Sequence, residues 1–231
     1  QASKINNLKY GIELKTKSRS VRDLPGYDEG KWVIQDRSSQ WVSTLLNPKK
    51  GDKILDACAA PGSKTTHLAE MIYDKGEIWA FDRSEFRLKI LKENLKRLNI
   101  KCVQVHKGDS INITDLKPDL RFYFDKILID APCSGIGTFA RNPDARWSLN
   151  KNKIDQLISL QEKLLHCIFP LLKRTGTLVY STCTICPREN NLLIKNFLKN
   201  NNHINLVCEK QILPSCTNSG DGFYAAVLNY I

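Results

Sequence analysis

The segment IDAPCSG, residues 129–135, places an acid, a proline, a thiol and a glycine directly after an apolar run. A second thiol stands in YSTCT, residues 180–184, after another apolar run. If both runs are buried strands of a parallel sheet, Cys133 and Cys183 lie at the edge where such sheets bind ligands. A single cysteine is most often a small buried hydrophobic side chain. Two thiols at one ligand edge instead indicate nucleophilic chemistry on a shared substrate, because a thiolate is a strong nucleophile once its pKa is lowered.

Acids or small residues also follow the other apolar runs. DACAAPGSKT, residues 56–65, is a turn that lets the backbone approach a ligand closely and directs helix N–H groups toward it. It matches neither the dinucleotide motif nor the triphosphate motif of glycine-rich loops. Asp82 lies about twenty residues further on, where a carboxylate can bind both hydroxyls of a ribose. Asp109 and Asp130 follow the next two predicted strands. Any one of these acids alone is most often a cap or turn residue, but an acid or a small-residue turn after four consecutive strands predicts a nucleoside-containing ligand.

Short apolar segments that alternate with amphipathic ones must position these residues. The predicted strands are residues 53–58, 77–82, 103–109, 124–130 and 176–182. The predicted helices are residues 63–73, 85–98, 153–172 and 188–200. This alternation predicts right-handed crossovers and an α/β fold with a mostly parallel sheet and helices on both faces. Residues 204–208 and 222–231 are expected to add a C-terminal antiparallel hairpin at one edge.

Composition and charge favour a protein that binds nucleic acid. With 231 residues, 42% of them hydrophobic, the chain can bury a full core, and its net charge of +11 favours a polyanionic partner. Residues 1–50 carry ten Lys or Arg against five Asp or Glu, and four aromatic residues, Tyr10, Tyr27, Trp32 and Trp41. We expect residues 1–50 to form an extension that packs on a catalytic domain of residues 51–231 and contacts RNA. Packing alone, or a merely solvated basic surface, is the alternative.

Several classes of protein are disfavoured. No apolar run reaches the 18 residues of a membrane helix, and the N-terminus lacks the apolar region of a signal peptide, so we expect a cytoplasmic protein without a membrane partner. Eight cysteines, several within apolar runs, predict reduced thiols. Cys183 and Cys186 form a CxxC pair, but no second pair or nearby histidine completes a metal site. The chain starts without methionine, so we expect a preceding domain; an oligomer is not expected.

Seven segments occur in an order that resembles a known family. They are DACAAPGSKT, GD, IDAPCSG, RNPDARW, YSTCT, PRENN and GDGFYAAVL. Over about residues 20–231 the chain is similar to the RNA cytosine-5 methyltransferases of the Fmu/Sun type, nearest to members that act on small-subunit ribosomal RNA. The resemblance implies a Rossmann-like methyltransferase fold, S-adenosylmethionine as methyl donor and RNA as partner. One departure is Ser63, where the family usually has a second glycine; serine is small and caps helices, so we expect the site to be retained, with weaker cofactor binding as the alternative.

The resemblance also implies residue roles. The methionine and ribose parts of the cofactor are assigned to Cys58, Ala59, Ala60, Pro61, Gly62, Ser63, Lys64 and Asp82. Asp109 is implied to bind the adenine, and Asp130 to lie between the cofactor and the target base. The flanking RNA strand is expected to contact Arg141, Arg146 and Trp147 of RNPDARW, unless these form an ordinary loop anchored by the tryptophan.

Methylation at carbon 5 of cytosine requires prior attack on carbon 6, because carbon 5 is a poor nucleophile in the aromatic ring. The family's use of the TC cysteine assigns this attack to Cys183 and leaves Cys133 to assist product release. The competing assignment makes Cys133 the nucleophile, as the PC cysteine is in DNA cytosine-5 methyltransferases. Asp130, if protonated, would donate to ring nitrogen 3, and Lys64 would orient the base.

The substrate and the activity leave alternatives open. A base at the sheet edge must be unstacked, so a single-stranded or opened region of rRNA is the expected substrate. The same chemistry could act on tRNA or another RNA, and a catalytically idle RNA-binding module could keep the fold. A methyltransferase for small molecules or amino groups is disfavoured, because no NPPY-like turn follows the fourth predicted strand.

Overall fold

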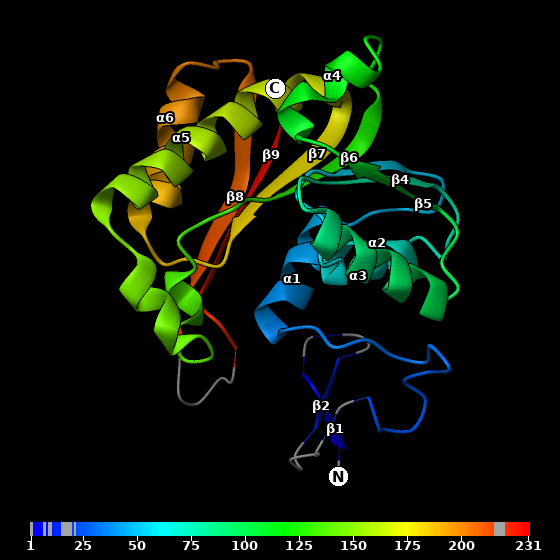
Figure 1. Cartoon of the computed structure of the whole chain (residues 1–231). Coiled ribbons are helices and arrows are strands. Elements are labelled where there is room, and N and C mark those ends of the chain that lie inside the picture. The colour runs from blue at the N-terminus through cyan, green and yellow to red at the C-terminus, as the bar shows by residue number, and fades with distance from the viewer. Residues whose placement is uncertain (1, 7, 9–10, 15–19, 21, 215–219) are drawn as a thin grey trace.

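The computed structural model describes residues 2–6, 8, 11–14, 20, 22–214 and 220–231. A seven-stranded sheet lies at its centre, in the order β5-β4-β3-β6-β7-β9-β8 (Figure 1). Its strands are β3 (Lys53–Asp56), β4 (Glu77–Asp82), β5 (Val103–Lys107), β6 (Phe124–Asp130), β7 (Leu172–Thr182), β8 (Ile204–Ile212) and β9 (Phe223–Tyr230). The first five are parallel, whereas β9 is antiparallel to both β7 and β8. The predicted mostly parallel sheet with a C-terminal antiparallel hairpin is therefore confirmed.

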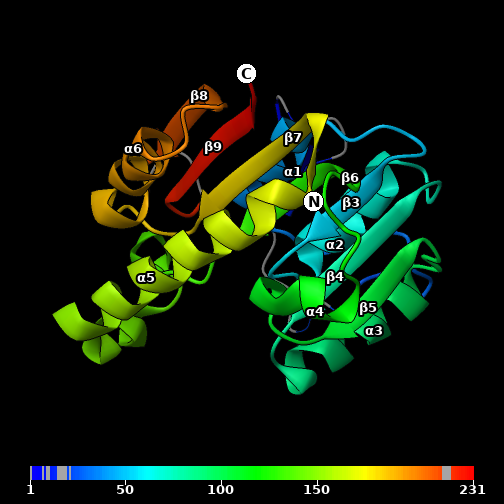
Figure 2. The same ribbon diagram turned by 90° about the horizontal axis from the view of Figure 1, so that it is seen from above.

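Helices cover both faces of the sheet (Figures 1 and 2). One face carries α1 (Arg37–Leu46), α2 (Ser63–Met71) and α3 (Glu85–Arg97), and the other carries α4 (Ile113–Leu116), α5 (Lys151–Ile168) and α6 (Asn191–Lys199). Alternate residues of a strand point to opposite faces. In β6, Ile127 and Ile129 therefore pack in the core beneath α5 and α6, whereas Leu128 packs beneath α1 and α2. Burial on both faces explains why these strands read as continuous apolar runs.

The topology reverses direction between β3 and β6. From β3 the chain builds the sheet outward through β4 to β5, then crosses back and places β6 on the other side of β3. In open α/β sheets, ligands bind beyond the carboxyl ends of the strands at such a switch point. The turn after β3 and the segment after β6 meet at this position, so the fold brings the two motif-bearing segments together.

Capping side chains start three of the long helices but not α2. Asp36, Ser84 and Asn150 accept hydrogen bonds from backbone N–H groups in the first turns of α1, α3 and α5. The residue before α2 is Gly62, which has a φ of +104° and no side chain to act as a cap. The first N–H groups of α2 are thus left without a side-chain acceptor at the carboxyl end of β3.

The boundaries of several elements differ from the predictions. Helix α5 ends at Ile168 instead of residue 172, because Pro170 lacks the N–H group that would continue the helix. Strand β7 begins earlier than predicted, since Leu172 pairs with Phe124 across an irregular register. Residues Pro187–Glu189 form a short 3-10 helix, η5, ahead of α6. The sequence reading also missed α1 and the small separate sheet of β1 (Ala2–Lys4) and β2 (Ile12–Leu14).

The N-terminal segment contacts the sheet layer at two places. Val42 and Leu46 of α1 are fully buried in the core beneath α1 and α2. Further upstream, the Arg97 guanidinium of α3 lies 4.0 Å from the centre of the Tyr27 ring and donates to the carbonyls of Tyr27 and Trp32. These two aromatic residues therefore have partners within the protein, whereas Tyr10 and Cys216 lie outside the described residues. None of the described helices is long and apolar enough to cross a membrane.

Candidate active site

Carboxylates gather at the carboxyl ends of the central strands. Asp82, the last residue of β4, accepts hydrogen bonds from the N–H of Ala60 (3.1 Å) and the N–H of Ser84 (2.9 Å). Asp109, beyond β5, caps the 3-10 helix η1 (Ser110–Asn112) and pairs with Arg83. Asp82 therefore ties the turn after β3 to the start of α3, and an acid follows each of these strands as the sequence predicts.

Asp56, at the end of β3, is fully buried. Its Oδ2 accepts a hydrogen bond from Thr65 Oγ1 at 2.7 Å, but its Oδ1 has no hydrogen-bond partner among the described residues. Burial raises the pKa of this carboxyl to about 7. The sequence marks this acid only as the end of a strand, because the burial that perturbs it comes from the surrounding elements.

Lys64 and Asp130 form an ion pair between α2 and β6. The Lys64 Nζ lies 2.7 Å from Asp130 Oδ2, and the lysine side chain is only 8% exposed. The second oxygen, Oδ1, accepts a hydrogen bond from Ser181 Oγ of β7 at 2.9 Å. Both oxygens of the Asp130 carboxyl group are therefore engaged by side chains of the protein.

The two thiols predicted to share a substrate are in direct contact. β6 and β7 are neighbours, with Asp130 opposite Ser181, and the sulfurs of Cys133 and Cys183 lie 3.4 Å apart just beyond these strand ends. A hydrogen bond from Cys133 lowers the pKa of Cys183, and the Lys64 ammonium contributes in the same direction. The pKa of Cys133 is raised by that same contact and by burial. The arrangement therefore favours loss of the proton from Cys183 before Cys133.

A buried polar network, which the sequence reading missed, fixes the loop that carries Cys133. Glu189 is fully buried and accepts hydrogen bonds from the Ser134 N–H (2.9 Å), the Ser134 hydroxyl and the Gln161 amide (3.0 Å). The same Gln161 amide group donates to the carbonyl of Pro132 at 2.8 Å. These contacts join α5, η5 and the loop. Their only signal in the sequence is the PRENN segment, to which no role could be assigned.

Two glycines bring the C-terminal loop against the thiol-bearing segments. The Gly222 N–H donates to the Gly137 carbonyl at 2.8 Å, and the Gly137 N–H donates to the Cys183 carbonyl at 3.1 Å. A Cβ atom on Gly137 would stand 2.2 Å from the carbonyl oxygen of Gly222. The close approach requires glycine at position 137, so this packing links the Cys133 loop, the Cys183 loop and the start of β9.

The three residues predicted to contact RNA occupy different environments. Arg141 binds the carboxylate of Asp221 through two nitrogens, with Nε 2.9 Å from Oδ1. The Arg146 guanidinium lies 5.7 Å from the centre of the Phe139 ring. Trp147 lies in the 3-10 helix η3 (Pro143–Ser148) and is 84% exposed. Arg141 is therefore engaged within the protein, whereas the Trp147 ring is open to a partner.

The remaining cysteines give no indication of metal or disulfide chemistry. The seven cysteines in the described ranges are all free. Burial raises the pKa of Cys58 well above its usual value, with Asp56 adding to the effect, so Cys58 is a neutral thiol in the turn after β3. Across the part of the chain that the structure covers, no three His, Cys, Asp or Glu side chains are grouped to hold a metal ion.

Comparisons with known proteins agree with this geometry. The sequence profile of one family, described as 16S rRNA methyltransferase RsmB/F, matches residues 43–229. The probable ribosomal RNA small subunit methyltransferase B of Synechocystis sp. is 45% identical over 83% of this chain and 43% of its own length. The ribosomal RNA small subunit methyltransferase B of Proteus mirabilis is 43% identical over 91% of this chain and 49% of its own length. The chain thus spans about half the length of these curated relatives.

A solved structure has a similar fold. The structure of NSun6 from Pyrococcus horikoshii with SFG superimposes with a TM-score of 0.81 and 31% identity, over 91% of this chain and 56% of that chain. SFG is an analogue of S-adenosylmethionine. The fold is the Rossmann-like fold of S-adenosylmethionine-dependent methyltransferases.

Proposed function

Because the chain belongs to the RsmB/F family of 16S rRNA methyltransferases, we propose that it methylates carbon 5 of a cytidine in small-subunit ribosomal RNA. The observation that carries the proposal is the pair of thiols, 3.4 Å apart, beside the ion pair of Lys64 and Asp130. A lone thiol at this edge would suffice for one covalent step, whereas two in contact can divide attack and release between them. The enzyme would meet its substrate in the cytoplasm.

The turn after β3 and the acids beyond β4 and β5 fit S-adenosylmethionine, which supplies an activated methyl group when bound. The uncapped N-terminus of α2 suits the carboxylate of the methionine part, because free helix N–H groups bind anions. Residues 57–63 have small side chains, which would let a ligand approach the backbone closely, and Ser63 is the first residue of α2. In this proposal Asp82 binds the ribose hydroxyls and Asp109 the adenine.

The first step in the proposed reaction is attack by Cys183. Its thiolate forms a bond to carbon 6 of the cytosine, and the electron pair of the 5,6 double bond makes carbon 5 nucleophilic. Carbon 5 then takes the methyl group. The lowered pKa of Cys183 supports this assignment over attack by Cys133, whose pKa is raised.

Lys64 and Asp130 stabilise the charge that develops on the ring. Asp130 can pass a proton to ring nitrogen 3, and the Lys64 ammonium, whose Nζ lies 2.7 Å from Asp130 Oδ2, can supply that proton. In this scheme Lys64 and Asp130 together orient the base and deliver the proton.

Cys133 is the candidate for assisting the release of the product. The contact with Cys183 is the largest cause of its raised pKa, and that cause is removed once the Cys183 sulfur is bonded to carbon 6. Cys133 can then lose its own proton to solvent, and the resulting thiolate accepts the proton from carbon 5. The electrons of that C–H bond restore the 5,6 double bond, and the Cys183 thiolate departs. The proposed division of labour therefore follows from the order in which the two sulfurs lose their protons.

The proposal is tested by methyl transfer from tritiated S-adenosylmethionine to rRNA, with bisulfite sequencing to locate the modified base. Cys183→Ala should abolish transfer and form no adduct, whereas Cys133→Ala should accumulate a covalent protein–RNA complex. Adduct accumulation in Cys183→Ala would instead make Cys133 the nucleophile. Methyl transfer to tRNA alone would support the proposed chemistry with a different substrate. If no RNA is methylated, the chain would instead be an RNA-binding module without catalytic activity.

A further inference from the structure

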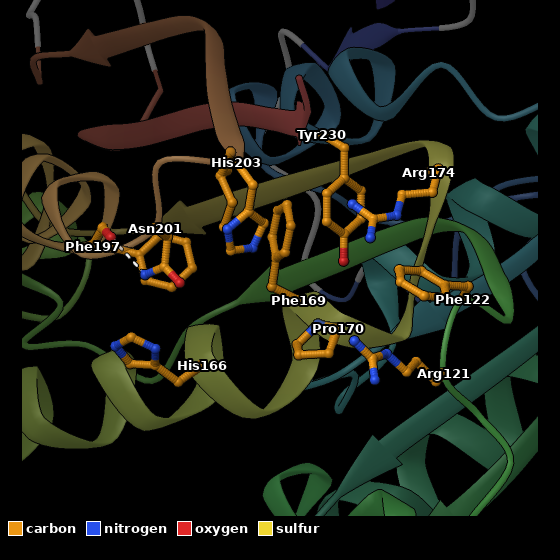
Figure 3. A pocket seen from close by; sticks show the side chains of 11 residues that line it. Arg121, Phe122, His166, Phe169, Pro170, Arg174, Phe197, Asn201, His203 and Tyr230 are labelled. Atoms are coloured by element: carbon orange, nitrogen blue, oxygen red, sulfur yellow. Dashed lines mark hydrogen bonds between the residues drawn. The ribbon is translucent and has the colours of Figure 1, made fainter.

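A cavity of about 290 Å³ lies at the edge of the sheet opposite the thiols. We call it the amino-edge pocket; its main side chains are Arg121, Phe122, Phe169, Arg174, Phe197 and Tyr230 (Figure 3). They come from the segments that enter β6 and β7, from α6, and from the end of β9. The chain advances six positions from Thr177, where the regular pairing of β7 with β6 begins, to Cys183, which places the pocket about 20 Å from the thiols. It is therefore separate from the proposed active site.

Aromatic rings form the base and one wall of the amino-edge pocket. Phe169 and Phe197 are only 2% and 3% exposed, so they provide a fixed floor. The Tyr230 ring stands 4.8 Å from Phe169 and 5.8 Å from Phe122, between ring centres, and is half-buried. His203 stacks beside Tyr230, with the ring planes 24° apart. This is a preformed set of flat apolar surfaces, the feature on which proteins stack unpaired bases.

Two exposed arginines stand over these rings. The Arg174 guanidinium lies 4.5 Å from the centre of Tyr230 and 4.7 Å from that of Phe122, and Arg121 lies 5.2 Å from the latter. Neither arginine forms an ion pair with any described residue. No carboxylate lines the pocket, and Glu162 lines a smaller adjoining hollow. The cations are thus held in place by the rings and are free to bind an anion.

The exposed surface of α5 connects the amino-edge pocket with the other edge of the sheet. The exposed side chains of this helix include Lys153 near its start and Lys163 and His166 near its end, and none of them is acidic. Its two acids, Asp155 and Glu162, are half-buried. From Lys153 to His166 the helix rises about 20 Å. A polyanion that leaves the region of Trp147 therefore meets exposed lysines on the way to the pocket, and the Asp155 carboxylate, whose side chain is 42% exposed, is paired with Arg188.

We infer that the amino-edge pocket binds an unpaired nucleotide of the RNA substrate, with its base against Tyr230 and its phosphates on Arg121 and Arg174. The identity of the RNA rests on the proposed function. The aromatic rings offer a stacking surface and the two arginines offer cations without an ion-pair partner, and both features occur together in sites for single-stranded nucleic acid. An RNA that reaches both places must span about 20 Å, so the pocket would favour substrates that extend well beyond the target base.

The test compares Arg121→Gln/Arg174→Gln with Lys92→Gln/Lys96→Gln, which removes the same charge from exposed positions on α3. Binding of long single-stranded RNA to the full chain is measured by fluorescence anisotropy over a range of salt concentrations. The arginine variant should bind at least tenfold more weakly, and the slope of log affinity against log salt should fall by about 1.4, the value for two phosphate contacts on a single strand. The lysine variant should retain the wild-type slope.

Three further readouts separate the pocket from the active site. Ultraviolet cross-linking of wild type to the RNA should yield a nucleotide adduct on the peptide that carries Tyr230 or Phe122. Methyl transfer to an RNA too short to span the two edges, and binding of S-adenosylmethionine, should be the same in both variants. Equal loss of affinity in both variants, or cross-links confined to other peptides, would overturn the inference while leaving the methyl-transfer proposal intact. Cross-links at Tyr230 in a protein that transfers no methyl group would support the pocket and contradict the methyl-transfer proposal.

Discussion

The sulfur of Cys133 lies 3.4 Å from the sulfur of Cys183, although fifty positions separate them in the chain. The register between β6 and β7 produces this contact. Asp130 stands opposite Ser181, and Cys133 and Cys183 follow these two residues in their loops. The contact has opposite effects on the two pKa values, lowering that of Cys183 and raising that of Cys133. In the proposed mechanism, this contact between the thiols favours Cys183 over Cys133 as the nucleophile.

Removing the donor at position 133 should make Cys183 less reactive at neutral pH. Cys133→Ala deletes the hydrogen bond that lowers the pKa of Cys183, so less thiolate is present at pH 7. We expect alkylation of Cys183 by iodoacetamide to slow about tenfold for each unit by which its pKa rises. The rate is followed against pH, with mass spectrometry to assign the modified peptide.

Cys133→Ser is the matched control for that experiment. Its hydroxyl can still donate to the Cys183 thiolate, so the pH profile of alkylation should stay close to that of wild type. Identical profiles for the alanine and serine variants would show that the contact between the sulfurs does not set the pKa of Cys183.

Asp56 should make the protein less stable as the pH rises toward neutrality. Its folded-state pKa of about 7 lies above its unfolded value, so the folded protein retains a proton that the unfolded chain has lost. Between about pH 5 and 7 this group should lower the free energy of unfolding by on the order of 2–3 kcal/mol, and above pH 7 the loss should level off.

The comparison of wild type with Asp56→Asn isolates this effect. Asparagine keeps the shape of the side chain and can still accept the hydrogen bond from Thr65, but it does not titrate. In urea unfolding at a series of pH values, the free energy of unfolding of the variant should therefore rise relative to that of wild type as the pH increases from 5 to 7. A difference that stays constant over this range would mean that Asp56 is ionised throughout.

Gly137→Ala should destabilise the protein, because the new methyl group would collide with the carbonyl oxygen of Gly222 at 2.2 Å. Backbone atoms have to move to relieve this contact, which costs about 1–3 kcal/mol in a well-packed region. Methyl transfer should fall as well, since the Gly137 N–H holds the Cys183 carbonyl. Gly108→Ala serves as control: no atom lies within 4 Å of its added Cβ, and the change in unfolding free energy should stay within about 0.5 kcal/mol.

Trp147→Ala should weaken RNA binding without changing stability. The ring is 84% exposed, so its loss removes little packing, whereas a base stacked on it contributes about 1–3 kcal/mol to binding. This corresponds to roughly 5–150-fold in the dissociation constant for single-stranded RNA. Tyr73→Ala, which removes another exposed ring from the far end of α2, should leave the affinity unchanged. Equal affinities for wild type and Trp147→Ala would remove this residue from the RNA-binding surface.

The order of strands and helices could be read from the sequence because each element is encoded locally. Apolar runs such as residues 124–130 predict strands buried on both faces, and a serine such as Ser84 predicts a helix start. The short helix α1 was missed because it lies in the basic N-terminal segment, where charge and aromatic content suggested an RNA surface. The end of α5 was misplaced because Pro170 falls inside an otherwise apolar run.

By itself, the sequence determined the fold class, the family resemblance and the positions at which acids and thiols leave the strands, since all of these depend on neighbours along the chain. Only the tertiary structure decided how those groups behave. The contact between Cys133 and Cys183, the buried Asp56, the Glu189 network and the arginines over Tyr230 each join segments from different elements. Proton affinity and ligand binding depend on burial and on distances between such segments, and these exist only after the chain has folded.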